Sequence, residues 1–213
     1  MWTPNDGLVS CEGGQRRITI HFKGGDYKTI VDKFEGNKLN SPNDLVLDNN
    51  GGIYFTDPRY GDRSDMEMEV EGVYYVYPGN RKLVRLVDDL ERPNGVIISN
   101  DFTRLYVADQ AADKTWQYAI KQPGQLGEKS EFAPIGSDGM TIDDFGNIYL
   151  TRDHHVYVYS PDGNELEKIP FPERPANVTF GGPGRNILFV TARTSLYSIE
   201  TKVTGGHARA NPK

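Results

Sequence analysis

The chain has 213 residues, of which 37% are hydrophobic and 25% are charged, and its formal net charge at pH 7 is −6. An acidic chain of this kind is a poor ligand for nucleic acid, because such binding depends on basic contacts to phosphate. No apolar run approaches the ~20 residues that a membrane helix needs. The single cysteine, Cys11, excludes an internal disulfide and leaves the redox compartment open.

The start of the sequence carries no basic segment followed by an apolar one, so no signal peptide is visible. The chain opens on a turn signal and reads as if it began inside a domain. We expect a soluble protein, either cytoplasmic or periplasmic, that binds neither nucleic acid nor a membrane and has no obligate protein partner.

A repeat of short β-rich segments organises the sequence. Predicted strands at residues 8–12, 17–22 and 27–31 form one incomplete unit that lacks its leading strand. Four apolar hexapeptides then begin at residues 53, 105, 148 and 188, with spacings of 52, 43 and 40 residues. This spacing suits one four-stranded propeller blade per repeat.

Each hexapeptide is the second strand of a predicted hairpin, because a short apolar strand and a turn rich in Gly, Asn and Asp precede it. Further strands complete each unit. We therefore predict a single all-β propeller domain over residues 1–213, with four blades and part of a fifth. The incomplete blade is 1–38, the blades are 39–91, 92–134, 135–172 and 173–203, and a polar tail covers 204–213.

An acidic insert at residues 62–69 lengthens the first complete blade. Long loops often carry function, so this insert is interpreted either as a lid or specificity loop over the central tunnel or as a solvated acidic loop.

A polar residue recurs shortly before each hexapeptide. Asn43, Asn94, Asp138 and Asn177 stand 10 or 11 residues ahead of it. If each innermost blade strand starts there, these side chains converge on the propeller axis at one mouth. Amide and carboxylate oxygens are hard donors that suit Ca²⁺ better than zinc. Turn chemistry explains any single instance equally well.

Several motifs together resemble the gluconolactonase and regucalcin-like (SGL) family, nearly end to end and in order. They are Asn40-Ser41-Pro42-Asn43-Asp44, the run from Ile53 to Gly61, Arg92-Pro93-Asn94-Gly95, Ser137-Asp138-Gly139, Phe180-Gly181-Gly182-Pro183 and the run from Thr191 to Tyr197. The resemblance implies a six-bladed propeller, here without its N-terminal blade, and a calcium-dependent lactonase with Ca²⁺, or another divalent metal, in the central tunnel.

The resemblance also implies roles for particular residues. Asn43, Asn94 and Asp138 would be metal ligands, and Asn43 would alternatively bind substrate. Asp138 would be the catalytic base that takes a proton from water, or a plain ligand. Asp57 and Tyr60 are the other candidate substrate-binding residues, although Asp57 equally suits the capping of a turn. A glutamate that the family uses in its first blade is missing, since Glu12 stands at the wrong place in its blade.

Three functions stay open at this point. The first is the opening of sugar lactones as small-molecule substrates, with the metal polarising the carbonyl. The second is hydrolysis of phosphotriesters or aryl esters on the same scaffold. The third is a non-catalytic propeller fragment or binding module, because a fold alone does not fix a function.

Overall fold

The computed structural model describes residues 1, 3 and 7–206. Residues 207–213, the end of the predicted tail, lie outside the described residues. Within them the chain is built from strands, with one short 3₁₀ helix, η1 (Gly13–Gln15), between the first two.

Five antiparallel sheets follow one another along the chain. The first consists of β1 (Leu8–Glu12), β2 (Arg17–His21) and β3 (Tyr27–Val31). The second consists of β6 (Leu45–Leu47), β7 (Ile53–Asp57), β8 (Gly72–Val76) and β9 (Leu83–Val87). The third consists of β10 (Pro93–Ile98), β11 (Arg104–Asp109), β12 (Lys114–Gln122) and β13 (Gln125–Ala133). The fourth consists of β14 (Met140–Ile142), β15 (Ile148–Arg152), β16 (His155–Tyr159) and β17 (Glu165–Pro170). The fifth consists of β18 (Pro175–Gly181), β19 (Ile187–Ala192) and β20 (Ser195–Glu200). A small hairpin of β4 (Lys33–Phe34) and β5 (Asn37–Lys38) joins the first two sheets.

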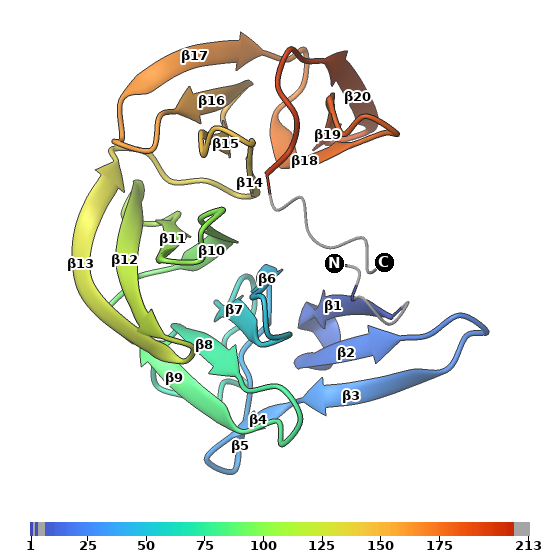
Figure 1. Ribbon diagram of the computed structural model, residues 1–213. Coiled ribbons are helices and arrows are strands. Elements are labelled where there is room, and N and C mark those ends of the chain that lie inside the picture. The colour runs from blue at the N-terminus through green and yellow to red at the C-terminus, as the bar shows by residue number, and fades with distance from the viewer. Residues whose placement is uncertain (2, 4–6, 207–213) are drawn as a thin grey trace.

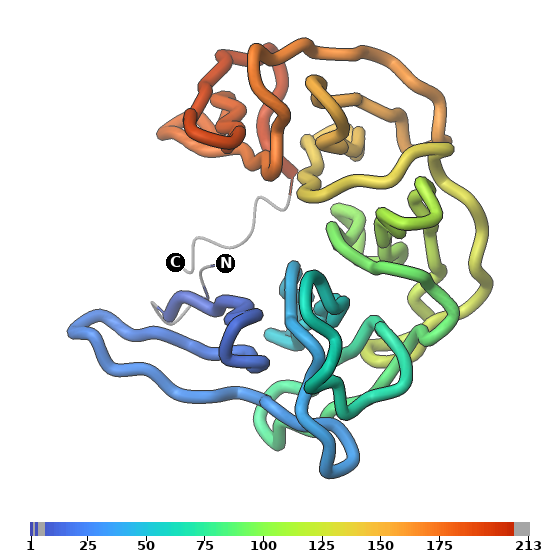
Figure 2. Tube along the Cα trace, turned by 180° about the vertical axis from the view of Figure 1, so that it is seen from behind, coloured from blue at the N-terminus to red at the C-terminus, as the bar shows by residue number. Residues whose placement is uncertain are grey.

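The five sheets stand around a common centre as the blades of a propeller (Figure 1). In the three four-stranded blades and the last blade, the first strand of each lies nearest the centre, namely β6, β10, β14 and β18. In the part of the chain that the structure describes, the ring is open between the β18–β20 blade and the β1–β3 blade (Figure 2).

The all-β class and the propeller architecture predicted from the repeat are therefore confirmed. The first blade has the three strands predicted for an incomplete blade, whereas the last blade has three strands where a complete one was predicted. After β20 the described chain adds no fourth strand to its own blade. It runs back instead, and Gly205 forms a bridge with Asp143 of the preceding blade.

The core lies between the blades. Strands β7 and β8 are buried along their whole length, because a neighbouring blade covers each face of their sheet. This explains why their sequences read as nearly continuous apolar and aromatic runs. Tyr54, Tyr74 and Tyr75 are at most 1% exposed, and the hydroxyl of Tyr75 donates a 2.6 Å hydrogen bond to Asp48. The tyrosine content thus serves interblade packing.

Two kinds of polar contact recur from blade to blade. The carboxylate that ends β7, Asp57, accepts both backbone N–H groups of Asn40 and Ser41, each at 2.7 Å. Asp109 at the end of β11 accepts the N–H groups of residues 91 and 92 at 3.0 and 2.9 Å. Each aspartate therefore anchors the segment that enters its own blade.

The second recurring contact is made by a buried threonine that links neighbouring blades. Thr56 donates to the backbone carbonyl of Asn94 at 2.7 Å, and Thr151 donates to that of Ala176 at 3.2 Å. Each hydroxyl also accepts the N–H of the residue that precedes its own inner strand, Asp44 or Gly139.

Candidate metal and substrate site

The pairing register shows which residues hold equivalent places ahead of the inner strands. Leu45, Val96, Met140 and Val178 each pair with the same position of the second strand of their blade. Counting back two residues gives Asn43, Asn94, Asp138 and Ala176. The expectation that Asn177 belongs to this set is wrong by one residue, because the turn between β18 and β19 is longer. The threonine contacts to the carbonyls of Asn94 and Ala176 identify the same pair independently.

Asn94 is presented by a β-bulge. The register of β10 against β11 shifts between Pro93 and Val96, so Asn94 and Gly95 leave the regular ladder. Bulges occur beside functional sites because they re-aim a side chain. Two backbone groups of this segment form hydrogen bonds with the preceding blade instead. Asp44 accepts the N–H of Val96 at 3.0 Å, and Thr56 donates to the carbonyl of Asn94.

The side chain of Asn94 is buried, and its two ends have different surroundings. Its Nδ2 donates to the hydroxyl of Tyr60 at 2.7 Å and lies 3.4 Å from Oε1 of Gln110. Its Oδ1 is buried and has no hydrogen-bond partner among the described residues. A buried carbonyl oxygen without a partner costs free energy, so this atom is a candidate ligand for a cation.

Asp138 is the anionic member of the cluster. It is half-buried at the start of the fourth blade. Burial raises the pKa of its carboxyl, and a hydrogen bond from Asn94 and the positive charge of Arg174 act in the opposite direction. The structure therefore brings Asn94 and Asp138 together, as the sequence analysis predicted.

Asp44 is a second carboxylate at this mouth and was not among the site residues predicted from the sequence. It accepts the N–H groups of Leu45 and Val96 at 2.8 and 3.0 Å. Burial raises its pKa to about 6, and the charge of Asp138 adds to this effect. The signal in the sequence was an acid directly after Asn43, in the same motif, but only the fold shows that it faces the next blade.

The remaining candidates occupy three different places. Asn43 is exposed, and its backbone N–H donates to the carbonyl of Thr56 at 2.9 Å. Tyr60 joins the cluster through its hydroxyl, which also donates to Gln110 at 2.6 Å. Asp57 does not join it, because both of its oxygens accept backbone N–H groups within a fully buried loop anchor.

Glu12 has a different environment. It accepts hydrogen bonds from Arg17, Thr19 and His21 at 2.6, 2.7 and 2.9 Å. Its carboxylate is therefore engaged within the β1–β2 hairpin. Across the described ranges, no group of three or more His, Cys, Asp or Glu side chains is placed to hold a metal ion. A cation at the Asn94 cluster would thus need amide oxygens as well as carboxylates.

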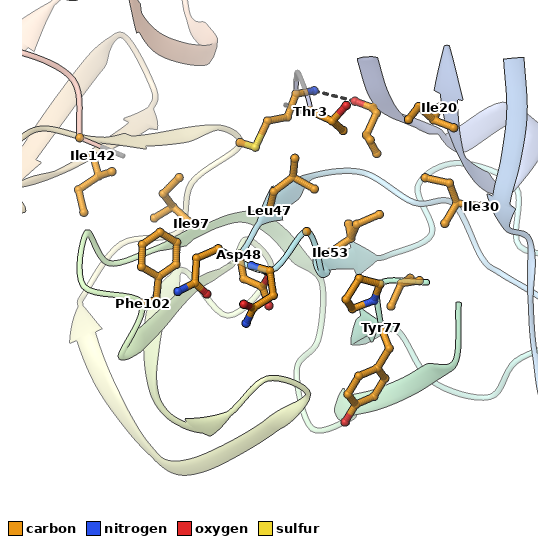
Figure 3. Close-up of a pocket in the computed structure, with 18 of the residues that line it drawn as sticks. Thr3, Ile20, Ile30, Leu47, Asp48, Ile53, Tyr77, Ile97, Phe102 and Ile142 are labelled. Carbon is orange, nitrogen blue, oxygen red and sulfur yellow. Dashed lines mark hydrogen bonds between the residues drawn. The ribbon is translucent and has the colours of Figure 1, made fainter. Parts of the chain in front are cut away.

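A cavity of about 900 Å³ lies at the other end of the inner strands, around the β6–β7 turn. Figure 3 shows that its wall is mostly aliphatic, with Ile53, Ile97 and Ile142 from three blades and Asp48 beside them. Size alone would favour this cavity as a binding site. The convergent polar groups favour the Asn94 mouth, because orientation and chemistry depend on such groups.

The fold and the polar cluster define a β-propeller with a candidate small-molecule site at one end of its inner strands. The profile of the SMP-30/gluconolactonase/LRE-like region matches residues 1–194. The chain belongs to this family. No helix long and apolar enough to cross a membrane occurs in residues 1, 3 and 7–206.

Three individual proteins show how far the similarity extends. The gluconolactonase of Zymomonas mobilis is 36% identical over 196 residues, which cover 83% of this chain and 54% of the relative. The diisopropyl-fluorophosphatase of Loligo vulgaris is 28% identical over 78% of this chain and 59% of the relative. A solved gluconolactonase structure from Xanthomonas campestris superimposes with a TM-score of 0.86 at 33% identity, over 91% of this chain and 68% of that one. The chain thus spans little more than half the length of the Zymomonas mobilis and Loligo vulgaris relatives.

Proposed function

We propose that this chain carries most of the active site of a metal-dependent hydrolase that opens sugar lactones. The observation that carries the proposal is the buried, unpartnered Oδ1 of Asn94, whose side chain is in hydrogen-bond contact with the carboxylate of Asp138. The similarity to two gluconolactonases supports the substrate class. We further propose that the complete propeller has six blades, consistent with the open side of the ring between β18–β20 and β1–β3.

The donor set fits a hard cation such as Ca²⁺. Asn94 offers a buried amide oxygen without a partner, and Asp138 offers a carboxylate in the same cluster. Asn43, at the equivalent position of the preceding blade, offers a second amide. Calcium takes six to eight oxygen ligands from carboxylates, amides and water, so these three residues would form part of its coordination sphere. When bound, the metal would polarise the lactone carbonyl and stabilise the developing oxyanion.

The residues of the chain supply the remaining steps. Asp138 is the proposed base, and its carboxylate would take a proton from the attacking water. A raised pKa makes a carboxylate a better proton acceptor near neutral pH, and burial acts on Asp138 in that direction. Asn43 is exposed at the equivalent position of the preceding blade, where it would also meet substrate hydroxyls. Tyr60 contributes through Asn94, and Asp57 holds the loop that leads into β6.

Hydrolysis of phosphotriesters is the second candidate. It is favoured by the similarity to the diisopropyl-fluorophosphatase of Loligo vulgaris over 78% of this chain. The same cluster would serve, because a phosphoryl oxygen is polarised by a metal in the same way as a carbonyl oxygen. A non-catalytic binding module is the third candidate, and it predicts cation binding without turnover.

Calorimetric titration with Ca²⁺ tests the proposal, using the 213-residue chain, its Asp138→Asn variant and Asp162→Asn as a control in an exposed turn. Saturable binding by the wild type and the control, with strong weakening in Asp138→Asn, is expected. A screen of gluconolactone against a phosphotriester then separates the first two functions. Equal Ca²⁺ affinity in all three proteins, or no binding by any, would overturn the proposed site.

A further inference from the structure

Tyr60 and Gln110 come from different blades and meet at Asn94. The Tyr60 hydroxyl accepts a hydrogen bond from Nδ2 of Asn94 at 2.7 Å and donates one to Oε1 of Gln110 at 2.6 Å. Oε1 of Gln110 also lies 3.4 Å from Nδ2 of Asn94. Asp138 accepts a hydrogen bond from Asn94 as well. All the hydrogen bonds of the amide are therefore made by its nitrogen, and Oδ1 is left without a partner among the described residues.

The position of Tyr60 is itself fixed by a buried anchor. Glu71 is 6% exposed, and its carboxylate accepts the backbone N–H of Arg59 at 3.0 Å. The guanidinium of Arg59 donates to the carbonyl of Asn40 at 3.0 Å. Arg92 lies over the Tyr60 ring at 5.3 Å from its centroid and 3.8 Å from the Glu71 carboxylate. The contacts of Arg59 and the Arg92 side chain over the ring thus hold the Tyr60 phenol against Asn94.

We propose that Tyr60 is a positioning residue that fixes the orientation of the Asn94 amide, so that Oδ1 stays the free end of the amide and can serve as the cation ligand. The inference rests on the proposed function and adds a role that acts through Asn94. A primary amide is nearly symmetric in shape, and a flip would point two N–H groups at a cation. The hydrogen bond to Tyr60 disfavours that flip. After a flip, Oδ1 would face the Tyr60 hydroxyl, which could donate to it only by giving up its hydrogen bond to Gln110.

Partners that orient a metal ligand typically contribute 10- to 100-fold in metal affinity. We expect Tyr60→Phe to raise the Ca²⁺ dissociation constant by about 10- to 100-fold. Tyr27→Phe is the matched control, since Tyr27 is an exposed tyrosine on β3, remote from the cluster. In excess chelator the melting temperature of Tyr60→Phe should fall by no more than about 2–4 °C, because the ring and its packing are retained and Nδ2 of Asn94 keeps Gln110 as a partner.

A double-mutant cycle separates orientation from general support. In Asn94→Asp both terminal atoms are oxygens, so the orientation of the group no longer matters. Tyr60→Phe should then change the calcium affinity by no more than about twofold in the Asn94→Asp background. The proton resonances of the Asn94 amide in the metal-free protein give a second readout: hindered exchange in the wild type should be lost in Tyr60→Phe.

The outcomes are distinct. A large loss in Tyr60→Phe that vanishes in the Asn94→Asp background supports the inference. The same loss in both backgrounds, or a loss below twofold in the first, overturns it and leaves the proposed metal site standing. If the wild type binds no Ca²⁺, the proposed function and this inference are both overturned.

Discussion

The hydroxyl of Thr56 in one blade donates a 2.7 Å hydrogen bond to the backbone carbonyl of Asn94 in the next. The same hydroxyl accepts the N–H of Asp44 at 3.2 Å. A side chain that is fully buried in β7 therefore connects the two inner strands that carry the candidate site. This hydrogen bond therefore both stabilises the packing of the two blades and fixes the position of Asn94.

We predict that Thr56→Val destabilises the protein by about 1–3 kcal/mol, because valine leaves the Asn94 carbonyl and the Asp44 N–H without a partner. Urea unfolding followed by tryptophan fluorescence measures the change. Thr191→Val is the control, since Thr191 is exposed at the equivalent position of β19 and its contact to Asn177 is 3.5 Å long. Equal destabilisation by the two substitutions would contradict the prediction.

Asp57→Asn and Asp109→Asn should each destabilise the chain by about 1–3 kcal/mol. Both native carboxylates accept two backbone N–H groups, and an asparagine would turn its NH₂ group toward one of these donors. Because the two anchors lie in different blades without a shared partner, their effects should add within about 0.5 kcal/mol. Chemical denaturation of the two single variants and the double variant checks this. If Asp57→Asn left the free energy of unfolding unchanged, Asp57 would again be a candidate substrate-binding residue.

Glu12→Gln should change the pH dependence of stability and leave Ca²⁺ binding intact. Burial would raise the pKa of Glu12, but the hydrogen bonds from Thr19, Arg17 and His21 outweigh it, and the pKa lies below the usual 4.5. A lowered pKa in the folded state means that the stabilisation is complete at neutral pH and is lost as the pH falls through that lowered value.

Melting curves of wild type and Glu12→Gln between pH 7 and pH 3 measure this effect. The gap between the two melting temperatures should be widest at neutral pH and should narrow in acid. A gap that stays constant over this range would contradict the assignment. A loss of Ca²⁺ affinity in Glu12→Gln would show that Glu12 contributes to the metal site after all.

The sequence predicted the propeller because each blade repeats a local pattern of strands and turns. It also predicted that Asn94 and Asp138 lie close together, because they occupy the same place in two repeats. It misplaced Asn177, because a longer turn shifts the pairing register by an amount that spacing alone does not show. Gln110 and Thr56 were missed for a different reason. Their partners lie in the next blade or on another loop, and no local pattern encodes contacts between blades.

The blade of β18–β20 has one buried face and one exposed face. Its side chains alternate, and Leu188 and Val190 are buried against the preceding blade. On the other face, Leu196 is 66% exposed and Thr191 is also exposed. In the described chain this face borders the open side of the ring. Exposed apolar surface next to unpaired strand edges favours association.

We therefore expect the 213-residue chain to self-associate with rising concentration, despite its net charge of −6. Leu196→Glu should reduce this association, because it replaces an exposed apolar side chain of this face with a charged one. Leu166→Glu is the matched control, since Leu166 is 56% exposed on the outermost strand of another blade, β17. Sedimentation velocity over a range of concentrations distinguishes the three proteins. A monodisperse wild-type monomer that melts cooperatively would show that the open side needs no cover, and the proposal of a sixth blade would lose its structural support.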